Sequence, residues 1–162
     1  MTWGQLNNDI YVTPRHQQRS RGDRKPVFGV LAEYGLAPDP NGTDADLQDI
    51  EAAYRRNGGT FDVLVNENGH IVGSVGLHAT SASICEIRKM YLASSARGKG
   101  MGRRLLEHAL AEAKSLGFSR VELETASVLK EAIGLYESYG FKRFYPSHLS
   151  PRCDSAYYVN VT

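Results

Sequence analysis

Hydrophobic and polar positions alternate in the central part of the chain, and this alternation predicts β-strands. Residues 61–65 place apolar side chains at every second position, the Asn68–Gly69 pair favours a tight hairpin turn, and residues 71–77 are expected to return antiparallel. Residues 1–8 are polar, and we expect them to be loose. Strands are expected at residues 10–13, 61–65, 71–77, 84–92, 121–125, 141–145 and 156–161.

Apolar side chains spaced three and four positions apart predict helices elsewhere in the chain. In the second of four such segments, Thr43 and Asp46 resemble a capping box at the N-terminus. Helices are expected at residues 26–34, from 43 to the glycines at 58 and 59, from a glycine-rich stretch to 116, and from about 128 to 139. The expected apolar faces are Leu47, Ile50, Ala53 and Tyr54 in the second helix, Leu105, Leu106, Ala109, Leu110, Ala113 and Leu116 in the third, and Leu129, Ala132, Ile133 and Tyr136 in the fourth.

The order of these elements predicts the fold class. A strand and two helices are followed by a run of three antiparallel strands, and then by helix, strand, helix and two strands. This order is typical of an α/β protein with a mixed sheet, largely antiparallel at first, that contains one strand–helix–strand crossover. A chain of 162 residues has room for one such domain, which we expect to span residues 1–162.

Composition and charge narrow the classes of partner. A net charge of +1 gives no bulk attraction to nucleic acid or to an acidic membrane, and no apolar run is long enough for a membrane span. Residues 15–25 carry five basic side chains, but Asp23 and the absence of interleaved aromatics disfavour a nucleic-acid arm. The five histidines and the two cysteines lack metal-ligand spacing. We therefore expect no metal, reduced thiols at Cys85 and Cys153, and a cytoplasmic location.

Residues 97–104, with the sequence RGKGMGRR, stand at the start of the third predicted helix. Glycine is a poor helix former, and cations in a first turn face the positive end of the helix dipole. Glycines do, however, let an anion approach the unpaired N–H groups of a helix N-terminus. The stretch therefore predicts an anion site rather than a flexible turn. It is not a dinucleotide fingerprint, because Arg103 takes the place of the third glycine, and no P-loop motif is present.

Two segments resemble the signature motifs of the GNAT superfamily of N-acetyltransferases. RGKGMG, residues 97–102, is similar to the family's R/Q-x-x-G-x-G/A motif and follows the strand expected at residues 84–92. AIGLYESYGF, residues 132–141, is similar to the family's second motif, A-I-x-L-Y-x-x-x-G-F. The resemblance implies a GNAT-like fold in which the strand–helix–strand crossover carries the cofactor loop.

The resemblance also implies acetyl-coenzyme A as co-substrate. Its pyrophosphate would lie on the backbone amides of residues 98–102, and its pantetheine arm would follow the strand end at residues 90–92. Many members carry Asn at the position of Leu129, so that contact would be absent or replaced, with Ser127 as one candidate. The implied cofactor-binding residues are Met90, Tyr91, Leu92, Arg97, Gly98, Lys99, Gly100, Met101 and Gly102.

Acetyl transfer to an amine requires a neutral amine, a donor for the oxyanion and a proton for the departing thiolate. Tyr136 matches the family tyrosine that protonates the thiolate, although helical periodicity alone would place it in the core. Tyr139 is expected to serve packing only.

Glu86 stands on the strand where some GNAT members keep a general base that acts through water. The alternative for Glu86 is an exposed strand residue paired with Arg88 or Arg120. Glu122 and Glu124 are the substitutes as base, with Glu124 preferred.

The sequence thus predicts an acetyl-CoA-dependent N-acetyltransferase in which a primary amine attacks directly in a ternary complex. An inactive acyl-CoA-binding module and a nucleic-acid-binding protein remain as alternatives. Residues 26–54 contain six acidic and no basic side chains, so we expect a cationic acceptor with Glu33 and Asp39 near its entrance. The family resemblance also allows a homodimer.

Overall fold

The computed structural model describes residues 4–7, 10–14, 42, 45–49 and 51–162. Its main feature is an eight-stranded mixed sheet in the order β1-β2-β3-β4-β5-β6-β8-β7, and only β5 and β6 pair in parallel. The sheet confirms the predicted α/β fold class. The elements are β1 (Gly4–Asn7), β2 (Ile10–Pro14), η2 (Ala45–Gln48), η3 (Glu51–Arg55), β3 (Thr60–Asn66), β4 (Ile71–Ala79), β5 (Ile84–Leu92), η4 (Ser94–Ala96), α2 (Met101–Ser115), β6 (Arg120–Thr125), α3 (Lys130–Ser138), β7 (Lys142–Phe144) and β8 (Ser155–Asn160).

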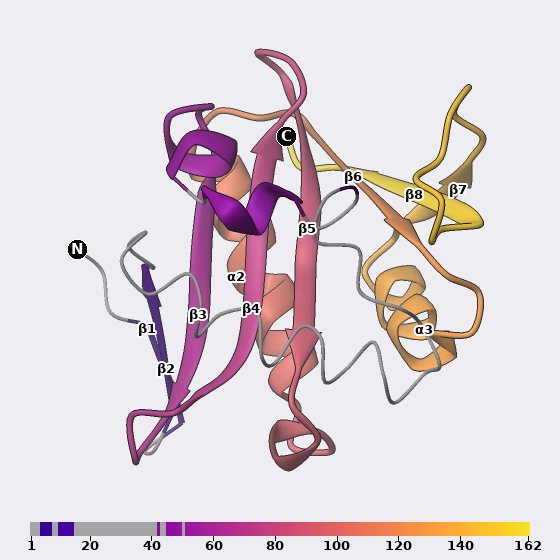
Figure 1. Ribbon diagram of the computed structural model, residues 1–162. Coiled ribbons are helices and arrows are strands. Elements are labelled where there is room, and N and C mark those ends of the chain that lie inside the picture. The colour runs from indigo at the N-terminus through magenta and orange to yellow at the C-terminus, as the bar shows by residue number, and fades with distance from the viewer. Residues whose placement is uncertain (1–3, 8–9, 15–41, 43–44, 50) are drawn as a thin grey trace.

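Different helices pack on the two faces of the sheet. In Figure 1, α2 lies behind strands β3 to β5, and the short helices η2 and η3 lie in front of them. Alternate residues of β3 therefore enter different cores: Leu64 packs in the cluster that contains α2, whereas Phe61 and Val63 pack with Leu47 and Tyr54 of η2 and η3. The period of two along a strand explains this division, because successive side chains point to opposite faces.

Strands β5 and β6 separate partway along their length. Their parallel pairing runs from Ile84 with Arg120 to Ile87 with Leu123, yet β5 continues to Leu92. Figure 1 shows β6 turning away from β5 toward α3. The second half of β5 therefore has backbone groups on the β6 side that take no part in β5–β6 pairing.

A bulge in β5 accompanies this separation. The register between β4 and β5 shifts between Ser74 and Gly76, and Lys89 adopts a φ of 52°, the left-handed region. Cys85 and Ile87 belong to the core cluster that includes α2. Strict alternation would place Lys89 on that same face, but its amine instead meets Asp46 of η2 on the opposite face. The bulge thus resets which side chains face η2.

The sequence predicted one helix from Thr43 to the glycines at 58 and 59, and this prediction is wrong for the residues of that segment that the structure describes. The structure has a 3₁₀-helix, η2, and a π-helix, η3, in its place. The Tyr54 hydroxyl donates a hydrogen bond to the Asp46 carboxylate, eight residues earlier. A continuous α-helix would separate these two backbones by about 12 Å along its axis, so the contact favours a broken helix.

Two smaller expectations also need correction. Gly4–Asn7 pair with β2 as strand β1, although residues 1–8 were expected to be loose. Leu116 was expected on the apolar face of its helix, but it is 45% exposed because it lies just beyond the end of α2. The helix expected at residues 26–34 lies outside the described residues.

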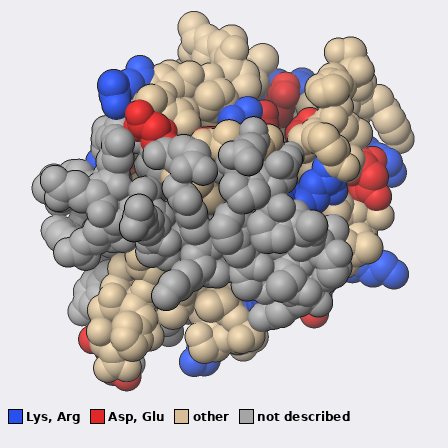
Figure 2. Space-filling model, viewed as in Figure 1, with Lys and Arg blue, Asp and Glu red and all other residues tan. Residues whose placement is uncertain are grey.

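The visible front face is mixed in charge. Figure 2 shows Lys and Arg side chains scattered among acidic ones around this face, with no broad basic patch among the residues that are described there. This distribution agrees with the net charge of +1 and gives no support to a nucleic-acid surface on the described part of this face.

Candidate functional site

A cavity of about 540 Å³ lies where β5 and β6 separate. Its wall combines the second half of β5, the glycine-rich loop, β6, α3 and the segment that precedes β8, so elements far apart in sequence meet there. Of the residues expected from the sequence, the cavity is lined by Glu86, Met90, Tyr91, Leu92, Arg97, Gly98, Gly100, Met101, Gly102 and Tyr136, and not by Lys99.

The loop end of the cavity has the properties of an anion site. Gly98 and Gly100 have φ values of 73° and 74°, and a Cβ added to either would meet no atom within 4 Å. Gly100 is the N-cap of α2, no side chain caps this helix end, and its first turn holds no acidic residue. The backbone can therefore approach a ligand closely, and the helix N-terminus suits a phosphate oxygen.

Arg97 has a structural task in this loop. Its guanidinium donates through Nε and Nη2 to the carbonyl oxygen of Leu92, at 3.2 and 3.1 Å. These hydrogen bonds fasten the loop to the end of β5. Lys99 is exposed and lies outside the cavity lining.

Tyr136 of α3 places a buried phenol at the cavity wall. Its side chain is 6% exposed and packs against Phe141, with ring centroids 5.7 Å apart. Burial raises the pKa of the Tyr136 hydroxyl, and the electrostatic influence of the neighbouring Tyr91 and Cys153 side chains, whose ionised forms are negative, raises it further. No hydrogen bond from this hydroxyl to another residue is found in the part of the chain that the structure describes. The group is therefore protonated at neutral pH and available to a ligand.

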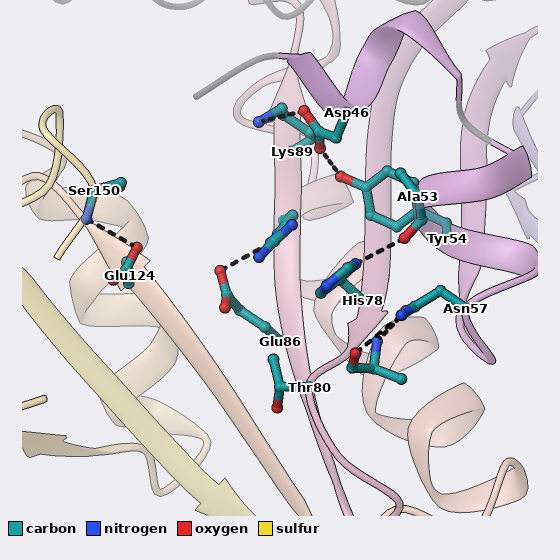
Figure 3. A network of polar contacts seen from close by, with 12 residues as sticks. Asp46, Ala53, Tyr54, Asn57, His78, Thr80, Glu86, Lys89, Glu124 and Ser150 are labelled. Carbon is teal, nitrogen blue, oxygen red and sulfur yellow. Dashed lines mark hydrogen bonds and ion pairs between the residues drawn. The ribbon is translucent and has the colours of Figure 1, made fainter. Parts of the chain in front are cut away.

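Two carboxylates face each other across the gap. Figure 3 shows Glu86 on β5 and Glu124 on β6 on opposite sides of it, and both line the cavity. Glu86 accepts a hydrogen bond from Nε of Arg88 at 3.0 Å, and Glu124 lies 3.4 Å from the backbone N–H of Ser150. Of the two partners expected for an exposed Glu86, Arg88 is the one that pairs with it, and Glu86 also lines the cavity.

Glu122 does not reach the cavity. It pairs with Nε of Arg120 at 2.9 Å, and Arg120 in turn lies over the ring of Tyr158, 3.9 Å from its centroid. The preference for Glu124 over Glu122 therefore agrees with the geometry.

The sequence did not reveal the residues that precede β8. Ser150, Arg152 and Cys153 line the cavity beside Tyr136. Cys153 is a half-buried free thiol, and burial raises its pKa. No periodic pattern marks this irregular segment, so no sequence signal placed it at the site.

Leu129 and Ser127, the candidate to replace its cofactor contact, differ in their position relative to the cavity. Leu129 lines the cavity, but Ser127 does not. The Ser127 backbone N–H and hydroxyl both donate to the carboxylate of Asp154, at 2.8 and 2.5 Å. Ser127 is therefore engaged away from the cavity.

Neither a metal site nor a membrane span is found among the described residues. No group of three or more His, Cys, Asp or Glu side chains there has an arrangement that could hold a metal ion. Within the same residues, no helix combines the length and apolar character that a bilayer crossing needs. His108 instead contacts Asp62, and His78 contacts the carbonyl oxygen of Ala53.

Comparison with known proteins gives matches over most of the chain. Residues 28–141 match the model of the acetyltransferase (GNAT) family. The chain is 42% identical to the uncharacterized N-acetyltransferase YjgM of Escherichia coli K12 over 146 residues, which cover 85% of this chain and 87% of that protein. It is 29% identical to the uncharacterized N-acetyltransferase C1271.07c of Schizosaccharomyces pombe, with 77% of each chain covered.

Solved structures share the fold at lower identity. A GNAT-family acetyltransferase from Staphylococcus aureus Mu50 superposes with a TM-score of 0.88 at 22% identity and covers 94% of this chain and 99% of its own. An acetyltransferase from Salmonella typhimurium, solved with acetyl-CoA, superposes with a TM-score of 0.72 at 19% identity and covers 96% of this chain and 95% of its own. With the family match over residues 28–141 and the close relative in Escherichia coli, these findings show that the chain belongs to the GNAT family of acetyltransferases.

Proposed function

We propose that the protein transfers an acetyl group from acetyl-CoA to a primary amine, with the amine attacking directly in a ternary complex. One observation carries this proposal: a single cavity joins a helix N-terminus without a side-chain cap, at the glycine loop, to the buried hydroxyl of Tyr136, which bonds to no other described residue. A phosphate-bearing ligand held at the loop end would extend toward a proton donor at the other end.

The residues present fit acetyl-CoA, which when bound supplies a thioester that is reactive toward amines. Residues 98–102 would hold the diphosphate through backbone N–H groups, because Gly98 and Gly100 leave the approach open. Met90, Tyr91 and Leu92 line the cavity on the part of β5 that does not pair with β6, so their backbone groups would hold the pantetheine arm. Arg97 would act indirectly, because it fastens the loop to Leu92.

Tyr136 would act as the general acid. A thiolate leaving group needs a proton, and the raised pKa of Tyr136 keeps its hydroxyl protonated until that proton is required. Phe141 and the neighbouring wall keep the phenol largely away from solvent. The family resemblance of residues 132–141 supports the same role.

The amine would lose its proton to Glu86 or to Glu124, directly or through water. An alkylamine has a pKa of about 10.4, so supplying its neutral form at pH 7 costs roughly 4 to 5 kcal/mol. Both carboxylates line the cavity, and Glu86 is restrained by Arg88. Among the described residues, Glu124 has the weaker contact from the Ser150 N–H, at 3.4 Å.

The charge of the acceptor remains a proposal from the acidic segment. Glu33, Asp39 and Asp44 lie outside the described residues. Asp46 and Asp49 are described and already paired, with Lys89 and Arg56 respectively. Glu33 and Asp39 are the pair expected near the acceptor entrance, so neutralising both should raise the KM of a cationic acceptor at low salt. The two free thiols favour the reducing cytoplasm as the location of the reaction.

A panel of amines tests the proposed function directly. Release of free CoA thiol from acetyl-CoA should depend on one class of amine, and mass spectrometry should find the acetylated product. Binding of acetyl-CoA without acetyl transfer to any amine would instead favour an inactive acyl-CoA-binding module. No binding at all would overturn the assignment of the cavity.

A further inference from the structure

We propose that Asp46 is a positioning residue for the acetyl-transfer site and that it acts through Lys89 at the bulge of β5. The proposal rests on the proposed function for its kinetic consequence, but the ion pair between Asp46 and Lys89 is a property of the free protein. It links η2, on one face of the sheet, to the β5 backbone that lines the cavity.

Lys89 is held by both its side chain and its backbone. Its amine lies 3.1 Å from the Asp46 carboxylate, and the two side chains are only 5% and 9% exposed. Its carbonyl oxygen accepts a hydrogen bond of 2.6 Å from the hydroxyl of Ser74, which is fully buried on β4. A lysine with a φ of 52° is in an uncommon conformation, so such contacts are needed to keep it there.

Asp46 is itself held in place by η3. Figure 3 shows the Tyr54 hydroxyl reaching Asp46 from the side opposite Lys89, and this hydroxyl donates a hydrogen bond to the carboxylate. The Tyr54 ring is fully buried and fills the space over Gly76, where an added Cβ would come within 2.6 Å of it. The carbonyl oxygen of Ala53 contacts Nδ1 of His78 at 2.7 Å. Asp46 of η2 is therefore held in a fixed position over β4 and is not a mobile surface charge.

The position of the ion pair indicates what it controls. Met90, Tyr91 and Leu92 follow Lys89 directly, line the cavity and lie beyond the last β5–β6 pair. Tyr91 and Leu92 pair with β4 on one side, but no described strand pairs with them on the β6 side, so their path depends on the bulge that sets the β4–β5 register. A buried ion pair adds little net stability over apolar residues of similar size, so its value here lies in fixing one backbone geometry. The carboxylate of Asp46 would thereby position groups that it does not touch.

The test compares Asp46→Asn with Asp49→Asn. Asp49 lies in the same segment, but its ion pair with Arg56 is exposed, with 67% and 45% side-chain exposure and a separation of 3.6 Å. Hydrogen–deuterium exchange of the free protein is the first readout, and we expect faster exchange at residues 90–92 in Asp46→Asn only. This readout requires no activity, so it remains decisive if the proposed function fails.

Steady-state kinetics is the second readout. We expect kcat of Asp46→Asn to fall roughly tenfold or more, because small misplacements near reacting groups cost up to about 10²-fold. Affinity for CoA, measured by calorimetry, should change less than about threefold, because the glycine loop is intact. Asp49→Asn should match the wild type in both.

Two further variants separate positioning from folding. Asp46→Glu should recover part of the lost kcat, because it restores the charge. The double variant Asp46→Leu with Lys89→Met removes both charges, so it should fold without an unpaired buried ion but keep the low kcat. The proposal is overturned if exchange at residues 90–92 is unchanged in Asp46→Asn, or if kcat per folded molecule is normal in the double variant.

Discussion

The hydroxyl of Tyr136 is a single atom on which the proposed chemistry depends. Tyr136→Phe removes that atom and keeps the ring that packs on Phe141. We expect kcat to fall by roughly 10² to 10⁴, the usual contribution of a general acid, while calorimetric affinity for acetyl-CoA is retained.

Tyr139→Phe is the matched control for this prediction. Tyr139 follows α3 directly, and its hydroxyl donates to Glu107 of α2 instead of lining the cavity. Its loss should leave kcat unchanged. If both variants lose activity only in proportion to their unfolded fraction, Tyr136 belongs to the core and not to the chemistry.

His108 of α2 and Asp62 of β3 form the second test at this scale. Nε2 of His108 lies 2.7 Å from the Asp62 carboxylate. Burial alone would lower the pKa of His108, but the hydrogen bond and the charge of Asp62 outweigh it and raise the pKa. The stabilisation is therefore complete below the unfolded pKa of about 6.5 and is lost as the pH rises through the higher folded pKa.

Denaturant unfolding at a series of pH values measures this effect. The free energy of unfolding of the wild type should fall from pH 6 toward alkaline pH more steeply than that of His108→Gln. His70→Gln, at an exposed position after the hairpin turn, should behave as the wild type. If the free energy of unfolding depends on pH equally in the wild type and in His108→Gln, the contact between His108 and Asp62 contributes no pH-dependent stability.

Helix α2 has a glycine with positive φ at each end. The same substitution, glycine to alanine, can therefore be compared at the two ends. Gly100 and Gly117 both have positive φ, 74° and 89°, and both have open space around a new Cβ. Alanine at either should therefore cost about 1 to 2 kcal/mol in backbone strain. Only Gly100 lines the cavity.

The expected difference is in binding. Gly100→Ala should weaken acetyl-CoA affinity about tenfold or more, ~1.4 kcal/mol, because the side chain obstructs the approach to the helix N-terminus. Gly117→Ala should lose similar stability and keep its affinity, as thermal unfolding and calorimetry can establish. Equal acetyl-CoA affinities in the two variants would contradict the assignment of the diphosphate site to this loop.

The helices and strands differ in how well the sequence predicts them. The helix with buried Leu105, Leu106 and Ala109 was predictable because its apolar spacing is local, and so was the β3–β4 hairpin. The break between η2 and η3 depends on Tyr54 meeting Asp46, which in turn meets Lys89 some forty positions later. No local pattern encodes such a contact. The same holds for Cys153, which reaches the cavity from an irregular segment.

At the scale of the whole molecule, the sheet has a short junction between β5 and β6, and among the described strands only the edge pairings β1–β2 and β7–β8, with three residue pairs each, are shorter. The β5–β6 pairing covers four residue pairs, whereas β6 and β8 share six and β2 and β3 share five. The part formed by β6, α3, β7 and β8 is joined to the rest by this short stretch of sheet next to the cavity and by the core cluster that it shares with α2. A ligand in that cavity would contact both parts, because its wall comes from both.

Hydrogen exchange should detect this junction. With acetyl-CoA at about 100 times its dissociation constant, linkage predicts roughly 2.7 kcal/mol of added stability. Exchange in β6 and β8 should slow by more than exchange in β3 and β4, because opening of the junction releases the ligand. Uniform slowing across the sheet would mean that the two parts open together.

This junction has a consequence for the lifetime of the protein in a cell. Local opening exposes a chain to proteases, and degradation follows the population of the open form. Since the cofactor would close the two parts together, a fall in acetyl-CoA would raise that population before global unfolding began. The amount of enzyme would then decline along with the supply of the molecule that it is proposed to consume.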